Sequence, residues 1–141
     1  MSDLIRFPFL PVTSRAGETF LQPLLPLTLR RPGGENIQMH GLLDSGAAVN
    51  VLPYSIGLHL GAVWEAQTTR VTLTGNLAAQ EARAPLTEIQ VTGFPSVRLV
   101  FAWTRSDAVP LLLGQVNFFQ EFDICFHRAR LQFEIQPAIR E

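Results

Sequence analysis

The chain has 141 residues, which is enough for one domain with a core of ordinary size and too few for a second domain. Hydrophobic residues make up 47% and charged residues 16% of it, a globular composition that argues against disorder. The formal net charge of -1 shows no imbalance that would indicate nucleic acid or an anionic membrane as a partner.

The first part of the chain is divided into short segments by glycine and proline, which favours strands over helices. Residues 20–29 are predicted to be extended, and their two prolines are typical of a sheet edge. A turn at 32–36 separates them from residues 37–43, where apolar residues alternate. These two runs are expected to pair as a hairpin that leads into Asp44.

Short elements are also predicted for the middle of the chain. Residues 49–52 have the composition of a strand, whereas residues 53–61 begin with proline and end with glycine, as a short helix does. Residues 69–74 alternate between polar and apolar side chains and run into Gly75-Asn76, which suits a hairpin tip.

The last part of the chain is predicted to hold four strands and a short helix. Two strands, 86–91 and 96–103, are joined by a turn that contains glycine and proline. Residues 115–122 can form a short helix, and residues 122–126 and 131–135 are expected to close the fold as a hairpin. The fold class is therefore predicted to be all-β with one or two short helices.

Two similar apolar runs stand out in the two halves of the chain. Residues 42–47 read Leu-Leu-Asp-Ser-Gly-Ala, and residues 111–114 read Leu-Leu-Leu-Gly without an acid. Asp-Ser-Gly alone occurs in many ordinary turns, where Asp and Ser cap backbone groups. Here two apolar residues precede Asp44 and an apolar stretch follows it, so the context favours a carboxylate held at the end of a rigid strand.

This combination resembles the retropepsin-like aspartic proteases over residues 19–136. Their pattern is an apolar pair, Asp-Thr/Ser-Gly-Ala and an apolar strand, followed later by an apolar-apolar-Gly run, a helix and a closing hairpin. The resemblance implies a closed barrel of the acid-protease type. Residues 1–18 would then be an N-terminal segment that is mobile or part of a dimer interface, and residues 137–141 a C-terminal tail.

The resemblance further implies a homodimer with its active site on the two-fold axis and Asp44 of each chain as the catalytic pair. A protease of this kind needs two carboxyls, one to take a proton from water and one to polarise the scissile carbonyl. Each chain carries one Asp-Ser-Gly, so the second carboxyl would come from another copy. Ser45, Gly46 and Ala47 would support the site, and no cofactor or metal would be needed.

A flap that folds over a peptide or protein substrate is implied for the hairpin around residues 73–79. The residues expected to line it or to bind substrate are Leu73, Thr74, Gly75, Asn76, Leu77 and Ala48. Two positions depart from the pattern: Ala48 stands where retroviral members usually carry Asp, and Asn50 stands where Thr or Ser is common. These departures bear on substrate contacts more than on the chemistry of Asp44.

The apolar chain ends are candidates for the outer part of the dimer interface: Leu4, Ile5, Phe7, Phe9, Ile135 and Ile139. The leading hypothesis is thus an aspartic endopeptidase. Two alternatives stay open. One is a non-catalytic member of the same fold that serves as a dimerisation module or binds an extended peptide as an added strand. The other is a structural β-domain in which Asp-Ser-Gly is fortuitous.

The cysteine content and the N-terminus bear on the compartment. The one cysteine, Cys125, cannot form an internal disulfide, and its apolar neighbours predict a buried thiol. The first residues lack the basic start and unbroken apolar run of a signal peptide, and no segment has the length and apolar character of a membrane span. These features favour the cytoplasm.

Overall fold

The computed structural model describes residues 3–67, 69–71, 73 and 82–139. Within them the chain is mostly β, with two short helices, α1 (Tyr54–His59) and α2 (Phe118–Glu121), as predicted. The strands are β1 (Ile5–Pro8), β2 (Leu10–Thr13), β3 (Thr19–Gln22), β4 (Leu24–Arg30), β5 (Ile37–Leu43), β6 (Asn50–Leu52), β7 (Arg70–Val71), β8 (Ala82–Arg83), β9 (Leu86–Val91), β10 (Val97–Thr104), β11 (Leu112–Leu113), β12 (Phe122–His127) and β13 (Gln132–Pro137). No helix among the described residues has the length and apolar character needed to cross a membrane.

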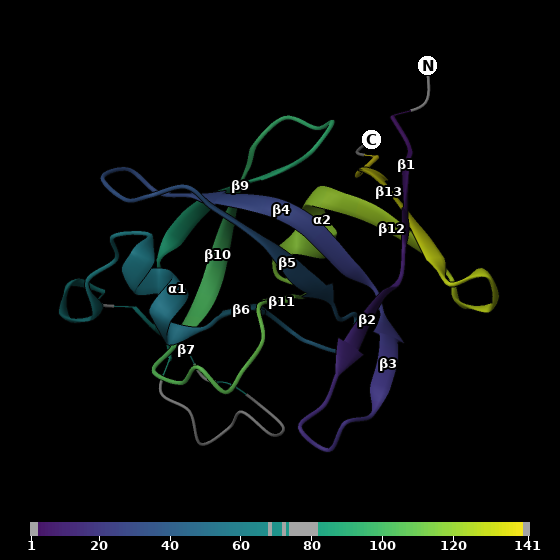
Figure 1. The fold of residues 1–141 in the computed structure, drawn as a ribbon. Helices are drawn as coiled ribbons and strands as arrows, with labels where there is room; N and C mark the ends of the chain where they lie inside the picture. The colour runs from purple at the N-terminus through teal and green to yellow at the C-terminus, as the bar shows by residue number, and fades with distance from the viewer. Residues whose placement is uncertain (1–2, 68, 72, 74–81, 140–141) are drawn as a thin grey trace.

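The largest sheet closes on itself as a six-stranded barrel (Figure 1). Its strands follow the order β6-β11-β5-β4-β9-β10, and the parallel pairing of β10 with β6 closes the ring. β8 and β7 extend the sheet from β10. The predicted closed barrel is therefore confirmed.

The hairpin predicted to lead into Asp44 is formed by β4 and β5, with Leu24 opposite Leu42. The prediction that its prolines make this run locally edge-like holds at Pro26: β4 lies between β5 and β9, but residues 24–26 pair with β5 alone. Pro26 is tolerated there because the pairing with β9 begins one residue later, at Leu27. A proline outside the pairing leaves no missing donor in the ladder between the strands.

Alternating side chains of the barrel strands fill the core. On β4, the leucines at 25, 27 and 29 are buried, and on β10 Phe101 and Trp103 are fully buried. Burying an aliphatic or aromatic side chain of this size contributes about 1.5–3 kcal/mol. The same core continues into Phe118 of α2 and Phe133 of β13, so the barrel and the second sheet share one core.

The chain ends form a second, three-stranded sheet with the order β1-β13-β12. The predicted closing hairpin is present as β12 and β13, and β1 pairs with β13 of the same chain. Phe9 and Ile135 are buried in the chain's own core, so their predicted place at the outer dimer interface is wrong. Leu4 and Ile139 remain exposed.

The prediction of a buried thiol at Cys125 is also wrong. Side chains alternate along β12, where Phe122 points inward and is buried. Cys125, three residues later, falls on the outer side opposite Glu134 and is exposed. An apolar sequence does not tell which of the two faces of an edge strand is covered.

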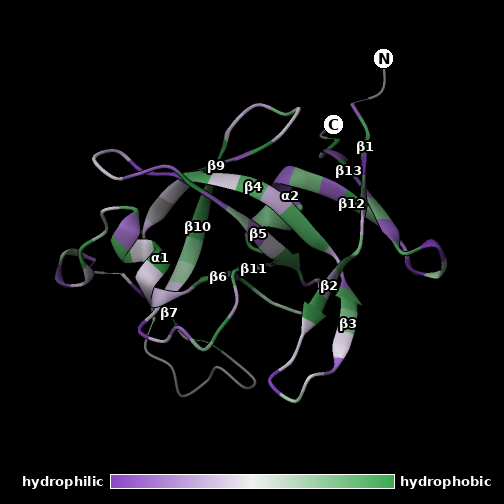
Figure 2. Cartoon of the chain, in the orientation of Figure 1, coloured by the Kyte–Doolittle hydropathy of each residue, from purple (hydrophilic) through white to green (hydrophobic). Residues whose placement is uncertain are grey.

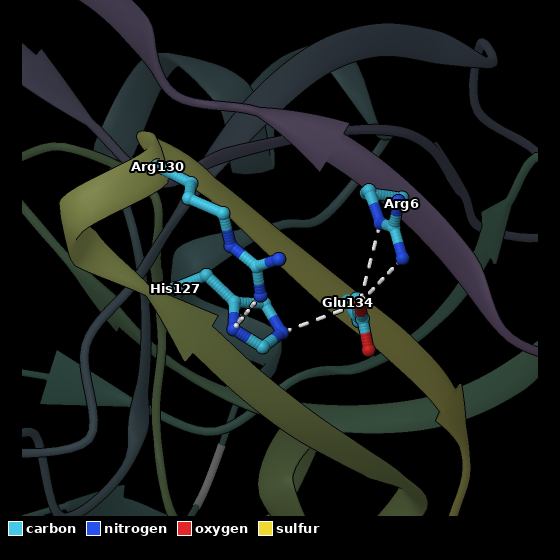
Figure 3. Close-up of polar contacts among 4 residues, drawn as sticks. All are labelled: Arg6, His127, Arg130 and Glu134. Carbon is cyan, nitrogen blue, oxygen red and sulfur yellow. Dashed lines mark hydrogen bonds and ion pairs between the residues drawn. The ribbon is translucent and has the colours of Figure 1, made fainter.

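A polar cluster fastens β1 to the closing hairpin (Figure 3). Nη2 and Nε of Arg6 lie 2.9 and 3.2 Å from Oε1 of Glu134. Nε2 of His127 lies 3.2 Å from the same oxygen, and Nη2 of Arg130 contacts Nδ1 of His127 at 2.7 Å. The hydrogen bond from Arg6, with His127 in support, holds the pKa of the Glu134 carboxyl below its ordinary value.

This depressed pKa predicts an acid-dependent contribution to stability. A carboxyl with a lower pKa in the folded state stabilises the fold above its unfolded-state pKa, about 4.3 for Glu, and loses that contribution as the pH falls through the folded value. We therefore expect Glu134→Gln to flatten the fall in the free energy of unfolding below about pH 5. Urea unfolding at several pH values measures this.

The exposed Glu35 in the turn before β5 provides the control, since Glu35→Gln should leave the acid dependence of the parent unchanged. Because Arg6 is 56% exposed, the difference should also shrink at high salt. Identical acid dependence for Glu134→Gln and the parent would contradict the role given to this cluster.

Candidate active site

Asp44 directly follows β5 and is held in place by β11. The two strands are parallel neighbours, with Leu42 opposite Leu112 and Leu43 opposite Leu113. The backbone N–H of Asp44 donates to the carbonyl of Leu113 at 3.0 Å. The two apolar runs that resemble each other in the sequence therefore lie side by side in the barrel, and one of them positions the acid at the end of the other.

The turn after β5 orients the carboxylate. Oδ1 of Asp44 accepts a hydrogen bond from the backbone N–H of Gly46 at 3.0 Å, and the Asp44 carbonyl accepts one from Ala47 at 3.0 Å. A Cβ at Gly46 would lie 3.3 Å from Oδ1, which is closer than most such contacts. Asp44 is half-buried, and its hydrogen bond within the described residues is made by Oδ1, which leaves Oδ2 without one.

The segment that follows β11 holds this turn in place. The side-chain amide of Gln115 donates to the carbonyl of Ser45 at 2.7 Å, and its backbone N–H donates to Ala47 at 2.9 Å. The N–H of Val116 donates to the carbonyl of Ala48 at 2.9 Å. The predicted support residues Ser45 and Ala47 are thus brought together with Asp44, and the exposed Ala48 lies beside them.

At Gly114 the segment after β11 crosses the backbone that follows Asp44. A Cβ on this residue would lie 2.4 Å from the carbonyl oxygen of Val49 and 2.8 Å from that of Ala47. A real Cβ does not approach a backbone oxygen this closely, so only glycine fits without moving the turn. This contact explains why the second apolar run ends in glycine.

Asn50 braces the crossing from inside. Its side chain is fully buried, and its Oδ1 accepts a hydrogen bond from the N–H of Gly114 at 2.8 Å. Its Nδ2 donates to the carbonyl of Val100 at 3.0 Å and to Oδ1 of Asn117 at 3.3 Å. Asn117 continues the network by accepting from the N–H of Val100 at 3.1 Å.

Sequence reasoning noted Asn50 as a departure from a pattern and missed this role. The available signal was a single amide side chain within the apolar run Val49–Leu52. Buried polar groups are almost always hydrogen-bonded, so a polar residue in a buried strand indicates a fixed partner. The partner, an N–H far along the chain, could not be named from the sequence.

The expected flap is described only in part. Thr74, Gly75, Asn76 and Leu77 lie outside the described residues. The flanking strands β7 and β8 pair antiparallel, with Val71 opposite Ala82, as a hairpin requires. Leu73 is 5% exposed and belongs to a small apolar cluster with Ala82 and Ala102.

The described part of the chain contains no group of three or more His, Cys, Asp or Glu side chains that could hold a metal ion.

Solved structures resemble the chain in fold. A retropepsin-like aspartic protease from Rickettsia conorii aligns with a TM-score of 0.61 and 15% identity, over 96% of this chain and 92% of that one. The EIAV protease in complex with the inhibitor HBY-793 aligns with a TM-score of 0.52 and 17% identity, over 77% and 92%. No family model and no curated protein matches the sequence. The chain therefore has the retropepsin-like fold, as predicted.

The buried network predicts a large cost for changing Asn50. Asn50→Ala leaves the buried N–H of Gly114 without its partner, and a buried group left unpaired costs about 1–3 kcal/mol. We expect a matching fall in the free energy of unfolding by urea. The exposed Asn36, in the turn before β5, is the control: Asn36→Ala should change stability by less than about 0.5 kcal/mol. Equal stability of the two variants would contradict the bracing role.

Proposed function

We propose that this chain is one subunit of an aspartic endopeptidase that is active as a homodimer. The observation that supports this best is the setting of Asp44. Its carboxylate stands at the end of β5, in a turn clamped by the apolar-apolar-Gly segment, within a retropepsin-like fold. This setting holds a carboxylate rigidly while leaving it half-exposed to a reactant.

The proposed reaction is hydrolysis of a peptide bond by water. One Asp44 carboxylate takes a proton from the water as its oxygen attacks the carbonyl carbon. The other carboxyl, which carries the shared proton, donates it toward the carbonyl oxygen, and a tetrahedral intermediate forms. Transfer of a proton to the amide nitrogen lets the C–N bond break, which yields an acid and an amine. No cofactor takes part in these steps.

The second carboxyl is assigned to another copy of the chain. Two of the other described aspartates have structural partners: Asp107 accepts from the backbone N–H of Ser55 at 2.8 Å, and Asp123 accepts from the backbone N–H of Ile139 at 3.3 Å. The hydrogen bond from Ser55 also lowers the pKa of Asp107. A two-fold axis beside Asp44 brings an identical carboxyl to the site without a second motif in the chain.

The remaining site residues follow from this arrangement. The exposed hydroxyl of Ser45 would brace the turn across the axis. The hairpin that continues β7 and β8, which includes residues 74–77, would act as the flap over an extended peptide. Ala48, exposed beside the turn, would line the substrate cleft.

Replacement of Asp44 tests the chemistry. Asp44→Asn keeps the shape and the acceptor for Gly46 but removes the acid–base group, so cleavage of a denatured protein should fall by at least about 10²–10⁴-fold. Sedimentation and circular dichroism should stay as in the parent. Asp107→Asn, which retains its acceptor oxygen for Ser55, is the matched control and should cleave normally.

Two outcomes would decide against this proposal. Parental activity in Asp44→Asn would exclude Asp44 as the catalytic group. A parent that binds denatured peptide but cleaves none from acidic to neutral pH would identify the non-catalytic peptide-binding module instead.

Mixing subunits tests the shared site. An excess of about ninefold of Asp44→Asn chains should reduce the activity per parent chain to about a tenth, because most parent chains then sit in dimers with one carboxyl. The same excess of Asp107→Asn chains should not poison the parent. Activity should also fall on dilution below the dimer dissociation constant. A monomer that stays fully active, and whose activity is unchanged by added Asp44→Asn chains, would rule out the shared site.

A further inference from the structure

The β2–β3 hairpin stands apart from both larger sheets. Its strands pair with each other, Val12 opposite Phe20 and Thr13 opposite Thr19, and with no other described strand. Figure 1 shows it extending away from the barrel beside the end of β5. A two-stranded hairpin is marginally stable in water by itself, so an uncovered one of this kind benefits from a partner surface.

Its composition is that of a contact surface. Phe20 is 50% and Leu21 is 41% exposed, and neighbouring side chains on a strand point to opposite faces. The strand sequences Leu-Pro-Val-Thr and Thr-Phe-Leu-Gln contain no charge. Figure 2 shows hydrophobic colour along β2 and at the base of β3. Uncharged strands with exposed large apolar groups indicate an association surface.

The base of this hairpin lies beside the strand that carries Asp44. Directly after β3, the carbonyl of Pro23 accepts a hydrogen bond from the N–H of Leu43 at 3.1 Å, and Leu24 lies opposite Leu42. Two residues of strand separate Leu42 from Asp44, about 7 Å, and paired residues on adjacent strands are about 5 Å apart. Leu24, two residues after the hairpin ends at Gln22, therefore lies within about 12 Å of Asp44.

In the proposed dimer, this closeness puts the hairpin at the subunit interface. Two Asp44 carboxyls that share a proton lie about 3 Å apart across the two-fold axis. The hairpin starts close to that axis, and its strands of four residues run about 13 Å further. An element of that length that starts this near the axis is long enough to reach the second subunit.

We propose that the β2–β3 hairpin packs the face that carries Phe20 against a second copy of this chain, beside the paired Asp44 residues. This inference rests on the proposed homodimer. A second copy suits the surface better than a transient substrate does, because large apolar groups without charge are typical of permanent homodimer interfaces. The hairpin would then add to the interface that completes the active site.

Hydrogen exchange of the unmodified protein tests this directly. Backbone amides of residues 10–22 should exchange fast below the dimer dissociation constant and be protected well above it. Amides of the barrel core, such as those of β4, should be protected at both concentrations. A dimer in which residues 10–22 exchange as fast as in the monomer would overturn the proposal.

Surface variants give the second measurement. Phe20→Ser combined with Leu21→Ser should raise the dimer dissociation constant, measured by sedimentation equilibrium, by at least about tenfold. Leu58→Ser is the matched control: Leu58 is 45% exposed on α1, away from the hairpin in Figure 1, and its change should leave the constant within about twofold. An unchanged dissociation constant with a raised KM would assign the hairpin to substrate binding and overturn the partner assignment.

These measurements separate the hairpin from the proposed function. A dimer that weakens in the hairpin variant but shows no Asp44-dependent cleavage would refute the enzyme and leave the interface standing. Asp44-dependent cleavage, together with a dimer dissociation constant that the hairpin variant leaves unchanged, would refute the hairpin interface alone. A chain that stays monomeric at every concentration would overturn the hairpin proposal together with the shared site.

Discussion

The close crossing of two backbone segments at Gly114 is the constraint on which the rest of the molecule depends. The segment after β11 passes so near the turn after Asp44 that a Cβ at Gly114 would lie 2.4 Å from the carbonyl of Val49. Asn50 fills the space behind it with a buried amide that binds both Gly114 and Val100. The crossing closes the barrel, because β6 pairs with β11 on one side and with β10 on the other.

The same crossing also explains why this chain brings one carboxylate to the candidate site. It delivers one carboxylate, on one rigid strand end, and nothing at the equivalent end of β11, where Gly114 replaces an acid. A reaction that needs two carboxyls then requires symmetry between chains. The rigid hold on Asp44 and the presence of one carboxylate rather than two have one origin, which is a single Asp-Ser-Gly turn packed against a plain apolar-apolar-Gly strand.

The terminal sheet narrows the surfaces that can carry such an association. β13 has both of its edges paired, with β1 and β12 of the same chain, and Phe9 and Ile135 are buried in the internal core. The chain ends therefore complete their own subunit first. Among the described residues, the turn after β5 and the β2–β3 hairpin, where Phe20 and Leu21 are exposed, are uncovered. The exposed hairpin is therefore the element that we assign to the contact with a second copy.

The amino-acid sequence by itself determined the local structure and the acid at the site. Period-two alternation, the positions of glycine and proline, and the resemblance around Asp44 were sufficient for the strands, the two short helices and the closed barrel. Tertiary structure alone decided which face or edge of each element is covered. Pro26 in a central strand, Cys125 exposed, Ile135 buried and Asn50 bound to Gly114 all depend on neighbours distant in the sequence. Local patterns record which side chains alternate, whereas burial and hydrogen bonding depend on which segments meet.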